Sequence, residues 1–275
     1  MCNIALYCME SPIITLTTDW SMRDHFAGKV KGRLYSTIPN VRVVDISHDV
    51  HEPEKMLSAA FLVKNACFDF PQGTIHLVDV TGTRSEDDVV VVEARGQYFI
   101  MVDNGLPSLI FGTDYTRAVT LPQREMSKMG NFMAYDIFCP TAAALAQGVP
   151  LEQVGTVRES ICPASTYKCS PEDNVLKVYI TYIDSYGNAY LDITYDEFEK
   201  YRAGRNFEVA VRESRISLRN FNEPISVRSM RSSQVELQLQ VAITGNLVIT
   251  TTLPSSKASG LFGLRERDVI RITFS

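Results

Sequence analysis

The hydrophobic periodicity of the chain changes near residue 160, and this change limits the possible folds more than any other feature of the sequence. In the first 150 residues, short β-rich runs alternate with stretches in which apolar residues recur every three or four positions. Strands separated by helices of this length predict βαβ crossovers. We therefore expect residues 1–160 to form an α/β N-terminal domain with a mostly parallel, buried sheet.

The strand-type runs of this domain are rich in β-branched residues, and each helix-type run carries one apolar stripe. The predicted strands cover 13–18, 41–46, 74–81, 89–94 and 97–102; the predicted helices cover 24–38, the stretch after Pro53, and 136–147. Arg95-Gly96 separates the last two strands, so we expect these two to pair as a hairpin.

The second part of the chain is dominated by strand signals. A polar, proline-containing segment, 161–174, is expected to be a linker, and strands are predicted at 175–183, 188–193, 207–211 and 235–243. The last run alternates apolar and polar residues strictly, as a half-exposed antiparallel strand does, and Gly245-Asn246 after it is typical of a hairpin turn. We expect residues 175–275 to form a smaller all-β domain, either a barrel or a sandwich.

Charge and composition limit the possible partners and compartment. The net charge of −5 offers no basic face for phosphates, and no apolar run approaches the length of about 20 residues that spans a bilayer. The first residues also lack the pattern of a signal peptide. We expect a cytoplasmic protein that binds neither nucleic acid nor membrane.

Six cysteines are scattered along the chain without CxxC spacing. A domain of this size can bury a core without disulfides, so we expect reduced thiols. A bridge between Cys162 and Cys169 is the alternative.

Acidic residues end two of the predicted parallel strands. In open α/β sheets, ligands gather outside the carboxyl ends of the strands. Asp19 ends the first strand, where it could accept hydrogen bonds from a ribose diol or cap the following helix. Asp79 and Thr81 end the third strand, and Asp79 could pair with the nearby Arg84 or face a ligand.

Two further polar stretches have a plain structural interpretation beside a functional one. Residues 45–52 include Asp45, His48, Asp49, His51 and Glu52, but polar residues past a strand end more often shape loops and caps than bind metal, and we expect no metal site. Residues 183–188 have the composition of a turn.

Six segments, taken together and in their order along the chain, carry a resemblance to a known family. They are LTTDWSMRDHFAGKVKG (Leu16–Gly32), VVDISHDV (Val43–Val50), FPQGTIHLVDV (Phe70–Val80), YFIMVDNGLPSL (Tyr98–Leu109), DIFCPTAAALAQGVPLEQVG (Asp136–Gly155) and YIDSYGNAYLDIT (Tyr182–Thr194). Together they resemble the S-adenosylmethionine (SAM) hydroxide adenosyltransferases, the family that also contains the SAM-dependent fluorinase and chlorinase.

This resemblance implies an α/β N-terminal domain with a smaller C-terminal β-barrel domain. It also implies a homotrimer whose active sites lie between subunits. The implied substrate is SAM, with no cofactor. Water or hydroxide attacks its 5′ carbon and methionine leaves, giving adenosine.

Site residues follow from the positions that match the family's motifs. Asp19 would hold the ribose hydroxyls, and Asp184 would bind the methionine ammonium. The implied substrate-binding residues are Asp19, Thr81, Asn104, Phe132, Met133, Asp184, Tyr186, Asn188 and Tyr190.

The catalytic set departs from the family pattern. Hydrolytic members use an Asp, an Arg and a His to hold and deprotonate water. Asp79 and Arg84 match the first two, but Met133 stands where the histidine would be. Ala134 stands where the fluorinase has a halide-contacting serine, and the fluorinase's extra loop is absent, so the sequence argues against halogenation.

These departures leave alternatives open. The fluorinase's arginines are also not reproduced in residues 243–252, which removes an expected partner for the methionine carboxylate. We expect a SAM-cleaving adenosyltransferase that uses water. A catalytically inactive homologue that binds SAM, adenosine or another nucleoside is the alternative, and a different activated substrate is a third possibility.

Overall fold

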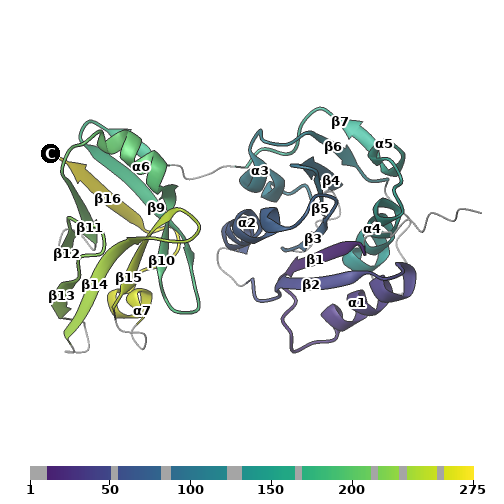
Figure 1. Cartoon of the computed structure of the whole chain (residues 1–275), viewed down its shortest axis with the longest axis horizontal. Coiled ribbons are helices and arrows are strands. Elements are labelled where there is room, and N and C mark those ends of the chain that lie inside the picture. Colours follow the sequence, from purple (N-terminus) through teal and green to yellow (C-terminus); the bar gives the residue numbers. More distant parts are fainter. Residues whose placement is uncertain are drawn as a thin grey trace, which may run out of the picture. The chain divides into compact units, whose positions relative to one another are not determined.

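The computed structural model describes residues 11–50, 55–81, 88–122, 132–164, 169–211, 216–228, 234–252 and 257–275. The chain divides into two compact units, residues 1–165 (unit 1) and residues 166–275 (unit 2). Figure 1 labels the helices and strands of each unit.

Unit 1 is built on a seven-stranded sheet with the order β2-β1-β3-β5-β4-β6-β7. Its strands are β1 (Ile13–Thr18), β2 (Arg42–Ser47), β3 (Ile75–Asp79), β4 (Val89–Ala94), β5 (Gln97–Val102), β6 (Arg117–Thr120) and β7 (Thr156–Arg158). Strand β1 pairs in parallel with β2 and β3, and β3 pairs in parallel with β5. The pairs β4–β5, β4–β6 and β6–β7 are antiparallel.

The prediction of a mostly parallel sheet is therefore wrong, because the sheet is mixed. The predicted hairpin between β4 and β5 is confirmed. Arg95 and Gly96 have φ values of 51° and 75°, a conformation that suits a two-residue hairpin turn. A turn this short can join only antiparallel strands, so β4 runs against β5, and β6 and β7 extend the sheet with further antiparallel pairs.

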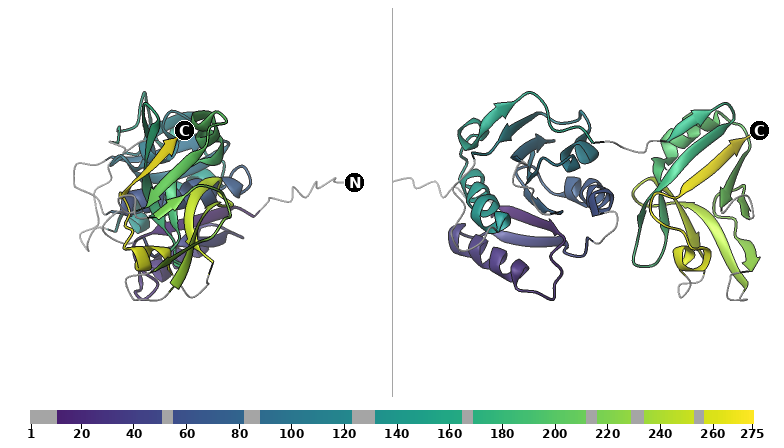
Figure 2. Two further views of the ribbon diagram at one scale, coloured as in Figure 1. Left: turned by 90° about the vertical axis from the view of Figure 1, so that its left-hand side faces the viewer. Right: turned by 180° about the vertical axis from the view of Figure 1, so that it is seen from behind.

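Helices cover both faces of this sheet (Figure 1). The helices of unit 1 are α1 (Phe26–Thr37), α2 (Lys55–Ala66), η1 (Cys67–Asp69), α3 (Leu106–Phe111), the π-helix η2 (Ala134–Phe138), α4 (Cys139–Ala146) and α5 (Leu151–Val154). Helices α1 and α4 pack one apolar core against the sheet, and α2 and α3 pack a second core against its other face. The view from behind in Figure 2 shows the same two helical layers.

Unit 2 holds an antiparallel, nearly barrel-shaped sheet. Its elements are β8 (Ser170–Glu172), β9 (Val175–Ile183), β10 (Ala189–Thr194), α6 (Tyr195–Arg202), β11 (Phe207–Val211), β12 (Ile216–Leu218), β13 (Ile225–Arg228), β14 (Gln234–Val241), β15 (Asn246–Thr251), α7 (Ala258–Phe262) and β16 (Val269–Phe274). The predicted hairpin at Gly245-Asn246 joins β14 to β15, and Gly245 has a φ of 81°.

Two details of unit 2 differ from the sequence prediction. The unit is not all-β, because it contains helix α6. This helix begins with a capping box in which the side chains of Thr194 and Glu197 accept from each other's backbone N–H groups. Strand β8 lies within the segment 161–174 that was expected to be a linker, and it pairs with β9.

The described residues contain no helix that is long and apolar enough to cross a membrane. The four cysteines among them, Cys67, Cys139, Cys162 and Cys169, are free thiols in this structure.

Two glycines give a matched test of packing in unit 1. A Cβ atom on Gly155, between α5 and β7, would lie 2.5 Å from the backbone oxygen of Thr120 in β6, whereas a Cβ on Gly32 in α1 would meet nothing within 4 Å. Gly155→Ala should lower the free energy of unfolding by about 1–3 kcal/mol, because the sheet has to move apart. Gly32→Ala should raise it by about 0.5–1 kcal/mol through helix propensity. Urea denaturation of both variants checks the signs, and a stable Gly155→Ala protein would contradict this packing.

Candidate functional site

A group of polar residues lies at the carboxyl ends of β1 and β3. Thr18 of β1 and Asp79 of β3 are register partners in the parallel pair. Asp19 follows β1, and its Oδ2 accepts hydrogen bonds from the Thr81 backbone N–H at 3.1 Å and from Lys55 Nζ at 3.2 Å. Helix α1 begins at Phe26 with His25 as its N-cap, so of the two roles considered for Asp19 the structure does not support that of a cap on this helix.

Thr81 and Asn104 connect the ends of β3 and β5. Thr81 has a φ of 68°, in the left-handed region. Asn104 Nδ2 donates to Thr81 Oγ1 at 2.8 Å, and Asn104 Oδ1 accepts from the Leu106 backbone N–H at 3.2 Å. Asp19, Thr81 and Asn104 therefore form one connected polar group.

Asp79 is the buried acid of this group, with 9% of its surface exposed. Burial raises the pKa of its carboxyl from the ordinary value of 3.8 to about 7, with a further contribution from the negative charge of Asp19. A hydrogen bond from the Trp20 side chain acts in the opposite direction and lowers this pKa. The carboxyl therefore changes its charge near neutral pH.

Aromatic side chains lie beside the two carboxylates. Trp20 stacks on His48 with ring centroids 6.1 Å apart, and it meets Phe132 edge-on at 5.1 Å. Phe132 also contacts Phe26 at 5.3 Å. Met133 packs against the apolar core on the α1 and α4 face, together with Trp20 and Phe132. A thioether carries no proton to exchange, so Met133 cannot act as an acid or a base.

Arg84 lies outside the described residues. Its pairing with Asp79 and its catalytic role stay predictions.

A second polar group lies in the turn between β9 and β10 of unit 2. Asp184 Oδ1 accepts from the Asn188 backbone N–H at 2.9 Å, and Asp184 Oδ2 accepts from Asn188 Nδ2 at 2.9 Å and from the Tyr190 hydroxyl at 3.3 Å. Gly187 has a φ of 80°, and a Cβ on it would lie 2.5 Å from the Cβ of Lys257. The turn therefore requires glycine at this position.

The environment of this second group is anionic. Burial and the charge of Asp184 raise the pKa of the Tyr190 and Tyr182 hydroxyls. Tyr186 lies in the same turn and is 72% exposed. Its role in substrate binding stays a prediction.

Several contacts in these groups were not predicted from the sequence. They involve Lys55, which bonds Asp19; Trp20 and His48, which stack beside Asp79; and Thr250, whose Oγ1 donates to Asn188 Oδ1 at 2.5 Å. Residues 45–52 had been considered as possible metal ligands. His48 Nδ1 lies 2.6 Å from Thr18 Oγ1, and its Nε2 lies 3.1 Å from Asp45 Oδ1. The described residues contain no group of three or more His, Cys, Asp or Glu side chains that could hold a metal ion, and His51 and Glu52 lie outside the described residues.

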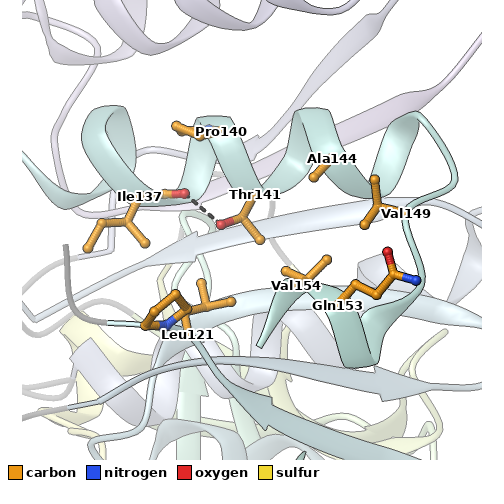
Figure 3. Close-up of a pocket in the computed structure, with 9 residues that line it drawn as sticks. Leu121, Ile137, Pro140, Thr141, Ala144, Val149, Gln153 and Val154 are labelled. Carbon is orange, nitrogen blue, oxygen red and sulfur yellow. Dashed lines mark hydrogen bonds between the residues drawn. The ribbon is translucent and has the colours of Figure 1, made fainter. Parts of the chain in front are cut away.

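A pocket of about 130 Å³ lies elsewhere in unit 1, between α4, α5 and the end of β6 (Figure 3). Leu121, Ile137 and Ala144 give it apolar walls. Thr141, the hydroxyl that lines it, donates to the Ile137 carbonyl at 2.8 Å. The pocket includes none of the acidic or aromatic residues described above, so it is not the candidate site.

The chain was compared with a family model, with named proteins and with solved structures. The model of the SAM hydroxide adenosyltransferase N-terminal domain matches residues 14–155. A Salinispora tropica protein named (R)-S-adenosyl-L-methionine hydrolase is 24% identical over 273 residues, which cover 96% of this chain and 98% of that protein. A fluorinase of Nocardia brasiliensis is 26% identical over 225 residues, covering 70% and 75% of the two chains. The crystal structure of an uncharacterized conserved protein from Thermotoga maritima is 26% identical and aligns with a TM-score of 0.78 over 95% of this chain and 99% of that chain.

The raised pKa of Asp79 predicts a specific pH dependence of stability. Between about pH 4 and pH 7 the folded protein keeps a proton on Asp79 that the unfolded chain has lost. The contribution of Asp79 to stability is therefore complete below about pH 4, falls as the pH rises toward 7, and levels off above it.

Asp79→Asn should remove this dependence. Relative to the wild type, the variant should gain on the order of 2 kcal/mol in free energy of unfolding between pH 5 and pH 7. Urea denaturation at several pH values measures the difference. A constant difference would mean that Asp79 titrates in its ordinary range.

Proposed function

This chain belongs to the SAM hydroxide adenosyltransferase family, and we propose that it cleaves SAM with water at the 5′ carbon to give adenosine and methionine. The observation that carries the proposal is that two carboxylates, Asp19 and Asp79, lie near each other at one edge of the unit 1 sheet. The two carry out different tasks because their surroundings differ.

Asp19 is proposed to bind the ribose. Its carboxylate is fixed by the Thr81 N–H and by Lys55, both on Oδ2, and it can accept from the ribose hydroxyls as well. Phe132 and Trp20 supply an apolar surface beside it, against which the sugar would pack. Apolar walls also remove water from the reacting carbon, and partial desolvation of the nucleophile lowers the barrier to displacement.

Asp79 is proposed to hold and deprotonate the nucleophilic water. The water oxygen attacks C5′ as the bond from C5′ to sulfur breaks, and the electron pair of that bond stays on the methionine sulfur. The carboxylate of Asp79 accepts the proton of the water. Since the sulfonium is already a good leaving group, positioning of the water is the main task of the protein.

Asp184 is proposed to bind the methionine ammonium, with Asn188 and Tyr190 holding its carboxylate in place. These residues belong to unit 2, whereas Asp19 and Asp79 belong to unit 1. We propose that the two groups meet between neighbouring subunits of a homotrimer. A crosslinking or sedimentation measurement of the oligomeric state tests this part of the proposal.

Water is proposed as the nucleophile rather than a halide. Ala134 is fully buried and offers no hydroxyl to a halide ion. Asp79 suits water, because a carboxylate repels halide anions and accepts protons.

The activity should depend on Asp79 and on its ionisation. Purified protein incubated with SAM should release adenosine and methionine in equal amounts, in proportion to the protein added. The rate should rise about tenfold per pH unit below about pH 7 and level off above it, since the pKa of Asp79 is raised to about 7. Asp79→Asn should lower the rate by about 100-fold or more.

Asp114→Asn is the matched control, because Asp114 is exposed and pairs with Arg95 on the surface. Chromatography against a sample without protein corrects for spontaneous decay of SAM. Binding of SAM without any product would favour the inactive SAM-binding alternative. The absence of both SAM binding and product would contradict the proposed function.

Met133→His tests how much the missing imidazole limits the rate. General-base assistance is typically worth about 10²–10⁴-fold. Since Asp79 already supplies a base in our proposal, the substitution should raise the rate at pH 8 by about tenfold or less. A rise of about 1,000-fold would show that Asp79 is not an effective base in this chain, whereas Met133→Leu should leave the rate within about twofold.

A further inference from the structure

Asp103 is a buried acid that the proposed reaction does not use. It follows β5, directly before Asn104 of the candidate site, and its side chain is 2% exposed. Its Oδ2 lies 2.9 Å from Nη1 of Arg158, and both carboxylate oxygens accept from the Cys162 backbone N–H at 3.0 Å. A buried carboxylate is costly unless it is paired, and a buried ion pair often adds little net stability compared with apolar packing. The pair therefore needs an explanation other than stability.

The contacts of Arg158 extend across the sheet as far as β5. Arg158 ends β7, the last strand in the sheet order, and its Nη1 lies 3.3 Å from Thr120 Oγ1 in β6. The same nitrogen lies 3.5 Å from Oδ2 of Asp88, the residue before β4. The Asp88 carbonyl accepts from the Asp103 backbone N–H at 2.8 Å. Asp103 is therefore held both by its backbone and by its carboxylate.

The chain after β7 packs on the turn that contains Asn104. On one side of Asn104, the Cys162 N–H donates to the carboxylate of Asp103. On the other side, a Cβ on Gly105 would lie 3.4 Å from the Cβ of Ala164. The residues on both sides of Asn104 are therefore in contact with the same segment of the chain.

Asn104 connects this ion pair to Asp19. Its Nδ2 donates to Thr81 Oγ1 at 2.8 Å, and the Thr81 backbone N–H donates to Asp19 Oδ2 at 3.1 Å. From Arg158 to the Asp19 carboxylate, each step is a contact within hydrogen-bond distance, except for the peptide bond that joins Asp103 to Asn104.

We propose that the Arg158–Asp103 ion pair positions the ribose-binding part of the candidate site. The pair fixes the backbone before Asn104, and through Asn104 and Thr81 it orients the Asp19 carboxylate. The proposal rests on the proposed function only for the binding of ribose by Asp19, because the contacts themselves do not involve SAM.

Amide hydrogen exchange of the full chain without ligand tests the contacts themselves. The reporters are the N–H groups of Thr81 and Leu106, which donate to side chains of the candidate site. The Tyr98 N–H, which bonds a backbone carbonyl near the other end of β5, is the reference. Arg158→Gln should speed exchange at both reporters by about tenfold and leave Tyr98 within about twofold, because the loss of order is local.

Kinetics with SAM test the consequence for the substrate. Arg158→Gln should raise KM by about tenfold and leave kcat within about threefold, because the substitution weakens binding and leaves Asp79 in place. Arg158→Lys keeps the cation and should keep KM within about threefold. Arg219→Gln is the matched control, since Arg219 is exposed and pairs with Glu208 in unit 2. It should change neither constant.

A double-mutant cycle tests whether the pair acts through Asn104. Asn104→Ala removes the link to Thr81, so Arg158→Gln should raise KM by less than about twofold more in that background. Equal effects in the two backgrounds would overturn the proposal. Asp103→Asn keeps an oxygen for the Cys162 N–H and removes the charge, so it decides the result if Arg158→Gln does not fold.

The exchange data separate positioning from a merely structural role. Unchanged exchange at Thr81 and Leu106 in a folded variant would contradict the proposal. Exchange that speeds up equally at Tyr98 would contradict it too, because the whole strand would then be destabilised. Faster reporters in an active variant whose KM is unchanged would show that the pair has no part in ribose binding. If the reporters respond but the wild type neither binds nor cleaves SAM, the proposed function fails and the positioning by Arg158 stands.

Discussion

The parallel pairing of β1 with β3 is the constraint on which the candidate site depends. It sets Thr18 opposite Asp79, and so brings Asp19 and Asp79 to one edge of the sheet. Two carboxylates this close repel each other when both are ionised. Asp19 gains partners that stabilise its charge, Lys55 and the Thr81 N–H. Asp79 is buried instead and keeps its proton up to about pH 7. The sheet register thus brings together two identical side chains whose surroundings differ.

Many strands and helices of unit 1 could be predicted from periodicity, but the mixture of parallel and antiparallel strand pairs in its sheet could not. The strands at 13–18, 89–94 and 97–102 and the Arg95-Gly96 hairpin follow from local patterns, because turn chemistry acts over two residues. Strands β6 and β7 have four and three residues, too few to show a period of two, and they supply two of the antiparallel pairs. Helix α6 has eight residues, with Phe198 buried and Tyr201 partly buried against the core, so its apolar stripe is too short to stand out between two strand signals. Its Thr194 and Glu197 capping box was the signal that could have identified it.

The candidate site shows the same division between local and distant information. Strand ends indicated Asp19 and Asp79, because the edge where ligands gather follows from the fold class. The partners that tune these residues come from far along the chain. Lys55 is 36 residues from Asp19, and Thr250 is 62 residues from Asn188. No spacing pattern in one sequence connects such pairs. His48 was noticed as a polar residue, but its contact with Trp20 depends on the pairing of β2 with β1.

The replacement of the family's histidine by Met133 has a physical answer within the proposed function. An imidazole is useful as a base because its ordinary pKa of about 6.5 is close to the working pH. A carboxyl ordinarily titrates at 3.8 and is a weak base, but burial brings the pKa of Asp79 to about 7. Brønsted behaviour favours a base whose pKa lies near the operating pH, so a buried carboxyl can replace the imidazole for proton transfer. The position of this carboxyl follows from the sheet, because the parallel pairing of β1 with β3 makes Asp79 the register partner of Thr18.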